Sequence, residues 1–234
     1  MTTVSEPLRT ASSCIAPRPT PGGSVVLDWI DWPTYERFLA AVGNRRIFLT
    51  YDQGVLEIMS PLFNHEWWKT RVGILLRVLC RELGLRMLGA GSTTLRREDA
   101  ERGLEADDSY YIKNAPHMLG LRERIDLTQD PPPDLALEVE GTRSALDRMG
   151  IYATLGVPEV WRYDGEAIHV HRLRPDGGYE ESAQSVSFPA LPLAEFAGFI
   201  TETQGLDDLA LEDAFHDWVR QHVLPRLPDP PAGS

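Results

Sequence analysis

The segment from residue 134 to residue 140, with sequence DLALEVE, carries the side chains best suited to chemistry. In an extended strand alternate side chains face opposite sides, so Asp134, Glu138 and Glu140 would share one face and the aliphatic residues the other. Carboxylates this close repel one another, and burying them together requires a compensating cation or basic side chain. The pattern therefore predicts either a divalent-cation site or the solvated face of an antiparallel strand.

A second acidic strand start, EADDSYYI from residue 105, can lie beside the first and direct Asp107 toward Glu138. Two carboxylates on adjacent strands can hold a hard cation such as Mg²⁺ or Mn²⁺ and leave positions for water and phosphate oxygens. Such an ion can bind a phosphate, lower the pKa of an attacking water and neutralise developing charge. The predicted chemistry is metal-dependent hydrolysis of phosphodiester bonds.

Length and composition favour one domain over residues 25–223, with mobile tails at 1–24 and 224–234 that are rich in Pro, Gly and Ser. No run of about 18 apolar residues and no signal-peptide core occur, which predicts a cytoplasmic protein with no membrane partner. The net charge of −12 counts against an extended phosphate-binding surface but leaves a local one open. Only two of the 23 basic residues are lysines, and arginine is the better bidentate partner for phosphate.

The elements that must position the acids follow from periodicity and turn residues. Asp31 predicts the start of a helix that stops near Gly43, and Asp52-Gln53-Gly54 predicts a turn between strands 46–51 and 55–59. Asn64 predicts the cap of a long helix that ends at Gly84. Further strands are expected at 86–97, 107–112 and 134–140, which gives a mixed α/β fold with helices flanking the sheet.

The carboxyl-terminal half shows the same kinds of signal. Ser144-x-x-Asp147 is typical of a capping box, and the helix it opens should end at Gly156. Asp164-Gly165 predicts a hairpin turn between strands 159–163 and 166–173. Further strand and a terminal helix over 206–223 complete the expected core.

The order of several segments resembles the Uma2 family (DUF820), a bacterial family of restriction-endonuclease-like proteins in the PD-(D/E)xK nuclease superfamily. The segments are LEIMSP from Leu56 with His65-Glu66, EAD from Glu105 with Tyr111-Ile112, RERIDL from Arg122, PPPDLALEV from Pro131, and DRMGIYATLGVPEVWRYD from Asp147. They span about residues 45–200. The resemblance implies a restriction-endonuclease-like core in which Asp107 matches the aspartate of PD and Glu138 the second metal-binding acid.

Two positions depart from the superfamily pattern. Ala106 stands where the motif has proline, which shapes the backbone rather than the chemistry. Glu140 stands where ExK places lysine, which reverses the local charge. The resemblance implies a basic group from the following helix, and the matching position is Arg148, which can stabilise charge but cannot serve as a general base. Lys69 is the other lysine considered for the site, and Lys113 should be too distant.

Glu57, His65 and Glu66 also match family positions and are further candidates for catalysis, ligand orientation or a second metal. Glu57 has an equally simple explanation as an exposed strand residue, and Glu66 as an acid that complements the positive end of a helix. His169-x-His171 has a metal-binding spacing but lacks further ligands, so exposed strand histidines are expected. Trp67-Trp68 could stack on bases, although Trp68 is expected in the core.

Two functions from different classes remain. The first is a Mg²⁺-dependent DNA endonuclease with Asp107 and Glu138 as ligands and Arg148 as electrostatic partner, and a homodimer is one assembly open to it. The second is a weak or inactive nuclease-fold protein used for binding or assembly, which the net charge, Glu140 and Arg148 favour. The presence of both Asp107 and Glu138 favours the enzyme.

Overall fold

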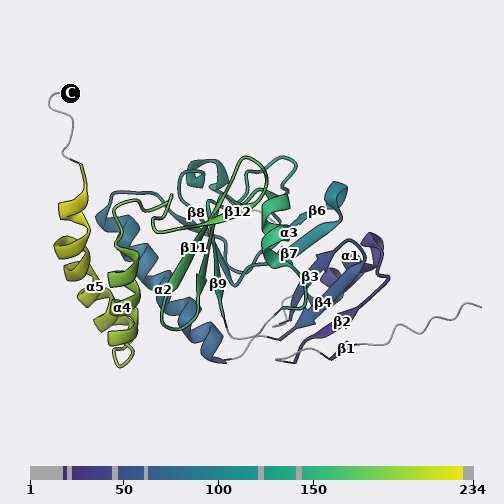
Figure 1. Ribbon diagram of the computed structural model, residues 1–234, viewed down its shortest axis with the longest axis horizontal. Coiled ribbons are helices and arrows are strands. Elements are labelled where there is room, and N and C mark those ends of the chain that lie inside the picture. Colours follow the sequence, from purple (N-terminus) through teal and green to yellow (C-terminus); the bar gives the residue numbers. More distant parts are fainter. Residues whose placement is uncertain are drawn as a thin grey trace, which may run out of the picture.

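A computed structural model describes residues 18–19, 23–43, 47–60, 63–120, 124–140 and 144–228 of the chain. Several predicted features lie outside these residues: the strand start at Arg46, Pro61 and Arg122 of the family-like segments, and most of both tails. The predicted mixed α/β fold with flanking helices is confirmed, and its strands divide between two sheets (Figure 1).

The first sheet is antiparallel throughout and has the order β1-β2-β4-β3-β7-β6. Its strands are β1 (Arg18–Pro19), β2 (Val25–Leu27), β3 (Phe48–Asp52), β4 (Val55–Met59), β6 (Thr94–Arg97) and β7 (Arg102–Glu105). β3 and β4 form the predicted hairpin. Its turn residues Gln53 and Gly54 both have positive φ, which matches the twist of the flanking strands.

The second sheet is mixed and has the order β12-β11-β10-β9-β8-β5. Its strands are β5 (Leu88–Gly89), β8 (Asp108–Tyr111), β9 (Leu135–Val139), β10 (Glu159–Tyr163), β11 (Ile168–Leu173) and β12 (Tyr179–Ser182). β9 and β10 are parallel, and the other pairs are antiparallel. A parallel pair needs a crossover, and here α3 (Arg148–Leu155) supplies it.

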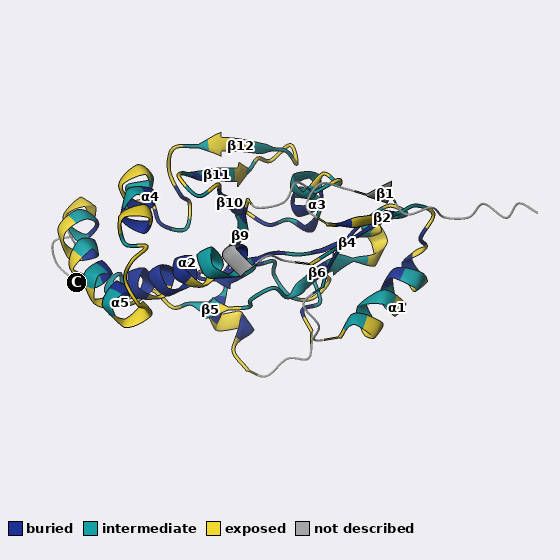
Figure 2. Ribbon diagram, turned by 90° about the horizontal axis from the view of Figure 1, so that it is seen from below, coloured by how far each residue is buried: buried dark blue, intermediate teal, exposed yellow. Residues whose placement is uncertain are grey.

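Three hydrophobic cores lie between the helices and the sheets. The remaining helices are α1 (Trp32–Val42), α2 (Phe63–Glu82), α4 (Leu193–Glu202) and α5 (Asp208–His222), with 3-10 helices at Glu98–Ala100, Ala115–Met118 and Leu224–Arg226. α2 and α4 cover one face of the second sheet, and α5 packs on these two helices as an outer layer (Figure 1). α3 packs between the other face of this sheet and β6 and β7 of the first sheet (Figures 1 and 2). α1 packs on β3 and β4. Among the described residues, none of the helices has the length and apolar character needed to cross a membrane.

Three predicted details are wrong. Asn64 is the second residue of α2 rather than its cap. The cap of α3 is Asp147, whose side chain accepts a hydrogen bond from the Gly150 amide, so the helix begins three residues later than a Ser144 cap would place it. The β10–β11 connection is four residues long, because Asp164 accepts from the amides of Glu166 and Ala167 and holds a wider turn. α4 was not predicted.

The chain passes from the first sheet to the second over only two residues. β7 ends at Glu105 and β8 begins at Asp108, so Ala106 and Asp107 form the whole link. Both are buried, at 0% and 2% exposure. The sheet-to-sheet crossing therefore fixes the position of Asp107 from both sides.

Gly103 should be required for the packing of α1 against the first sheet. A Cβ at this position would lie 3.0 Å from both Cζ of Tyr35 and Cβ of Arg96, and closer still to the Tyr35 hydroxyl. Tyr35 is fully buried and stacks on Tyr51, so it has no room to withdraw. We expect Gly103→Ala to lower the free energy of unfolding by about 1–3 kcal/mol in urea denaturation.

Gly198 in α4 is the matched control, because nothing lies within 4 Å of a Cβ placed there. Gly198→Ala should be neutral or stabilising by up to about 1 kcal/mol, since alanine is the better helix former. Equal destabilisation by both substitutions would contradict the assigned role of Gly103.

Candidate active site

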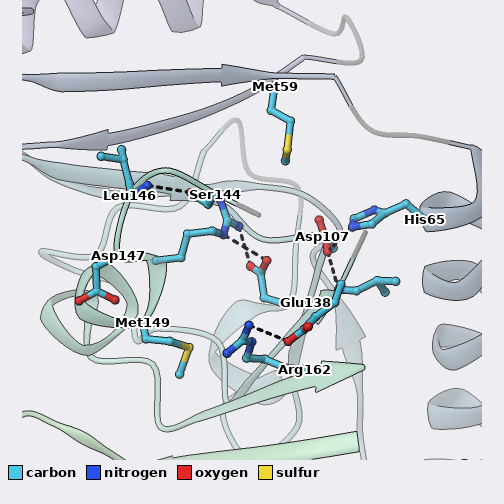
Figure 3. Close-up of a pocket in the computed structure, with 12 residues that line it drawn as sticks. Met59, His65, Asp107, Glu138, Ser144, Leu146, Asp147, Met149 and Arg162 are labelled. Carbon is cyan, nitrogen blue, oxygen red and sulfur yellow. Dashed lines mark hydrogen bonds and ion pairs between the residues drawn. The ribbon is translucent and has the colours of Figure 1, made fainter. Parts of the chain in front are cut away.

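The predicted acids meet at a cavity of about 490 Å³ between the two sheets and the start of α3. Its walls include Met59 from the end of β4, His65 from α2, and Asp107, Glu138 and Arg148 (Figure 3). The structure thus brings together four of the six predicted site residues. Glu57 and Glu66 do not line the cavity.

Asp107 is held by one donor from β9 and one from α2. Its Oδ2 accepts a hydrogen bond of 2.6 Å from the Val139 amide of β9 and lies 3.0 Å from Nε2 of His65. Burial of the His65 ring disfavours the imidazolium, but the hydrogen bond and charge of Asp107 outweigh it and raise the pKa of His65 above its ordinary value. The pair therefore carries an ion-pair character that the sequence did not reveal.

Glu138 projects from β9 and is 16% exposed. Arg148 donates to both of its oxygens, from Nη2 to Oε1 at 2.6 Å and from Nε to Oε2 at 3.1 Å, and the Tyr152 hydroxyl also donates to Oε1. Burial raises the pKa of Glu138, and the charge of Asp107 acts in the same direction, while Arg148 opposes it. The negative charge of Asp107 therefore acts on Glu138 within the cavity.

Arg148 joins the two sheets as well as the acid. Its Nη1 donates to the Thr50 hydroxyl of β3 at 2.7 Å, and its Nη2 also donates to the Glu105 carbonyl of β7 at 2.8 Å. Although burial disfavours the charged guanidinium, Glu138 raises the pKa of Arg148. The guanidinium is thus a fixed positive charge with four of its five N–H donors engaged.

The predicted alternation along β9 is found, since Leu135, Leu137 and Val139 pack in one core and Ala136 in the other, but the three acids of this segment have different partners. Asp134 accepts from the amides of Ile112 and Asn114 and from the Asn114 side chain, so it holds the backbone after β8. Glu140 points to the cavity rim, where it pairs with Arg162 at 2.6 Å. Glu138 and Glu140 both line the cavity with Asp107, and Asp134 does not.

Glu57 is buried rather than exposed, with 2% accessibility. Its carboxylate accepts from the hydroxyls of Ser24 and Ser144 and from the Ala145 amide. It therefore joins β4 to the segment before β2 and to the loop before α3, and its contacts account for its type without catalysis.

Glu66 pairs with Lys69 one turn later on α2, at 2.9 Å. Neither side chain lines the cavity. Lys69 lies close enough to Asp108 to lower the pKa of that acid, but burial prevails and the pKa of Asp108 is raised. Lys69 is therefore no substitute for the lysine of ExK.

Two site residues were missed by sequence reasoning. Tyr152 lies one helical turn after Arg148, so an Arg-x-x-x-Tyr spacing on a helix that follows an acidic strand was an available signal. Arg162 was not predictable from periodicity, because only the parallel register of β9 and β10 places it opposite Glu138.

The remaining expectations concern aromatic and histidine pairs. Trp68 packs on the core beside Tyr163, as predicted, and Arg71 stacks over Trp67 at 4.6 Å. His169 is a strand histidine with partners in Glu181 and Asp164, and burial lowers the pKa of His171. Within the described part of the chain, His169 and His171 are not part of any group of three or more potential metal ligands.

The structure thus brings two acids and an arginine to one cavity of a mixed α/β fold. Comparison with family models gives a match. The Uma2 model, described as "Putative restriction endonuclease", matches residues 32–223. The chain belongs to the Uma2 family. The resemblance found in the sequence is thereby confirmed, and the family description supports a nuclease.

Among solved structures, the chain is similar to "a putative nuclease belonging to DUF820 from Anabaena variabilis ATCC 29413". The two share 14% sequence identity and a TM-score of 0.42, and the match covers 71% of this chain and 90% of the other. Comparison with curated proteins gives no match.

Arg148 should contribute strongly to stability. Arg148→Gln leaves the mostly buried Glu138 carboxylate without its cation, and removing one partner of such a pair costs about 3–5 kcal/mol in urea denaturation. Arg162→Gln, at an ion pair about 40% exposed, should cost less than about 1 kcal/mol. The double variant Arg148→Gln/Glu138→Gln should recover part of the loss; no recovery would show that the charge pair is not the cause.

His65 should titrate above its ordinary pKa of 6.5 in metal-free buffer. The stabilisation from its raised pKa is fully present below about pH 6.5 and is lost as the pH rises through the folded-state value. In Asp107→Asn the opposing effect of burial prevails, so the pKa should fall below 6.5. NMR of the imidazole ring measures this, and Asp164→Asn, which affects His169, should leave His65 unchanged.

Proposed function

We propose that this protein is an endonuclease that hydrolyses phosphodiester bonds in DNA with one divalent cation, Mg²⁺ or Mn²⁺, held by Asp107 and Glu138. The observation that carries the proposal is the meeting of these two acids, from different strands, in one cavity with Arg148. Membership of the Uma2 family supports the same class of activity.

The hydrogen bonds of the two acids leave room for a cation. Each carboxylate oxygen has two lone pairs. Within the described residues, Asp107 Oδ2 takes two donors and Oδ1 takes none, while Glu138 Oε1 takes two and Oε2 takes one. Asp107 Oδ1 and Glu138 Oε2 are therefore the atoms with capacity to hold a metal ion.

The donor set fits one ion better than two. Mg²⁺ commonly uses one or two carboxylates and keeps several waters. Among the described residues, no group of three or more His, Cys, Asp or Glu side chains is placed to hold a metal. A second ion would need ligands that this part of the chain does not supply.

The protein side chains have separate tasks in this proposal. When bound, the cation supplies Lewis-acid stabilisation of the phosphate and a lowered pKa for the attacking water. Arg148 orients Glu138 and opposes the effect of burial on its pKa, and His65 orients Asp107. Arg148 cannot accept the proton of the water, since a guanidinium stays charged. Among the described residues, neither Lys69 nor Lys113 lines the cavity.

A second candidate is a weak or inactive nuclease-fold protein that binds without cutting. It is favoured by the engagement of Glu138 with Arg148 and Tyr152, because a cation at Oε2 must share this acid with an internal cation. The net charge of −12 points the same way, because it repels nucleic acid at long range.

Cleavage of supercoiled plasmid and of single-stranded DNA in Mg²⁺ or Mn²⁺ separates the two candidates. Asp107→Asn and Glu138→Gln should each reduce cleavage about 100-fold or more, because each removes a charged ligand at the reacting phosphate. Asp213→Asn and Glu202→Gln are matched controls at exposed positions on α5 and α4 and should keep wild-type activity. Cleavage that survives at Asp107 and Glu138 would defeat the assignment.

Metal binding has its own readout in thermal unfolding. An ion at 100 times its Kd stabilises the folded state by about 2.7 kcal/mol, which raises Tm. Asp107→Asn should abolish this increase and Asp213→Asn should keep it. No Mn²⁺-dependent increase in the wild-type protein, together with no cleavage, would favour the binding protein.

A further inference from the structure

Arg162 lies on β10 directly opposite Glu138 in the parallel register of β9 and β10. Adjacent strands are about 4.8 Å apart, and paired positions project to the same face. Both side chains line the same cavity, and Figure 3 shows Arg162 there with its ion pair as a dashed line. The cavity therefore has a second arginine besides Arg148.

The two arginines differ in their freedom to change partners. Arg148 is 12% exposed and makes four hydrogen bonds to Thr50, Glu105 and Glu138. Arg162 is 41% exposed, and its ion-pair partner Glu140 is 43% exposed. Ion pairs this exposed contribute about 0–1 kcal/mol, so an incoming anion can displace Glu140 at little cost.

Glu140 is held where it can compete for the guanidinium of Arg162. Its amide donates to the Tyr163 carbonyl at 2.8 Å, which keeps the first residue after β9 beside β10. Carboxylates and phosphates are alternative partners of an arginine side chain, since both accept two parallel N–H bonds. A phosphate at the cavity mouth would thus bind the atoms that Glu140 now contacts.

We propose that Arg162 binds a backbone phosphate of DNA at the mouth of this cavity, and that Glu140 occupies Arg162 until DNA displaces it. The inference rests on the proposed function, because it takes DNA as the ligand. It assigns a role to the charge reversal at residue 140: the acid limits DNA binding, and the cation comes from the neighbouring strand.

His169 does not share this role, although it lies opposite Arg162 on the other side, in β11. Its two ring nitrogens contact Glu181 and Asp164 at 2.9 Å and 3.3 Å. His169 does not line the cavity. His169 thus joins β11 to Asp164 of the β10–β11 connection and to Glu181 of β12, whereas Arg162 reaches the cavity.

Fluorescence anisotropy with a labelled DNA duplex in EDTA tests the proposal without catalysis. Glu140→Gln should tighten binding about fivefold, and Arg162→Gln should weaken it about tenfold and reduce the slope of log K against log salt by about 1. Arg162→Lys should retain the charge and part of the binding. In the double variant Arg162→Gln/Glu140→Gln, loss of Glu140 should not improve DNA binding appreciably over Arg162→Gln alone, because the guanidinium for which Glu140 competes is absent.

The exposed pair Arg174–Asp176 is the matched control, with a distance of 2.9 Å and exposures of 45% and 63%. Arg174→Gln and Asp176→Asn change net charge by the same amounts away from the cavity and should alter affinity less than twofold. Circular dichroism melting should show that all variants fold.

Three results would overturn the inference: equal improvement by Glu140→Gln with and without Arg162, equal effects of the control pair, or no DNA binding by any form. Its failure is distinguishable from failure of the proposed function. Coupled Arg162 and Glu140 effects without cleavage would retain the inference and remove the endonuclease. Cleavage that depends on Asp107, together with a DNA affinity that does not change in Arg162→Gln, would retain the endonuclease and remove the inference.

Discussion

The contact between Arg148 and Glu138 is the interaction on which the arrangement of this protein depends. It joins α3 to the second sheet, and the same guanidinium reaches Thr50 and Glu105 of the first. A charge this little exposed is unfavourable unless it is paired and its donors are satisfied, and four acceptors meet that need. The two sheets are therefore held together by the residue that also orients a candidate metal ligand.

This dual role creates a conflict between stability and chemistry. A carboxylate that binds its cationic neighbour through both oxygens is well oriented, but part of its capacity for a metal ion is used. Asp107 shows the same balance, because one oxygen is engaged by Val139 and His65. Both acids are therefore oriented by donors before any ligand binds, and one oxygen of each keeps capacity for a further contact.

The sequence predicted much of the fold, because the signals were local. The Asp31 cap, the Gln53-Gly54 turn and the Gly84 and Gly156 helix ends depend on neighbouring residues, and each is found where expected. The division into two sheets was not predicted. Strand periodicity is identical in one sheet or two. The chain passes between the sheets at β4–α2–β5, at β5–β6 and at β7–β8, and no residue pattern marks these crossings.

The part of the candidate site that depends on residue types and on the order of segments in the sequence was predictable. Asp107, Glu138, Arg148 and His65 were found through the strand pattern and the family resemblance, and they line one cavity. The different roles of Asp134, Glu138 and Glu140 were not predicted, because alternation gives the direction of a side chain and not its partners, and each acid has its own donors. Arg162 could not be found, since its place depends on the register between β9 and β10.

The two-residue crossing has a mechanical consequence. Asp107 is fastened through β7 to one sheet and through the Val139 amide to the other, whereas Glu138 moves with the second sheet alone. A small rotation of one sheet against the other changes the separation of the two acids before any strand pairing is lost. The affinity for an ion shared by the two acids would then depend on the relative orientation of the sheets. A ligand that contacts both sheets would change this affinity without touching the ion.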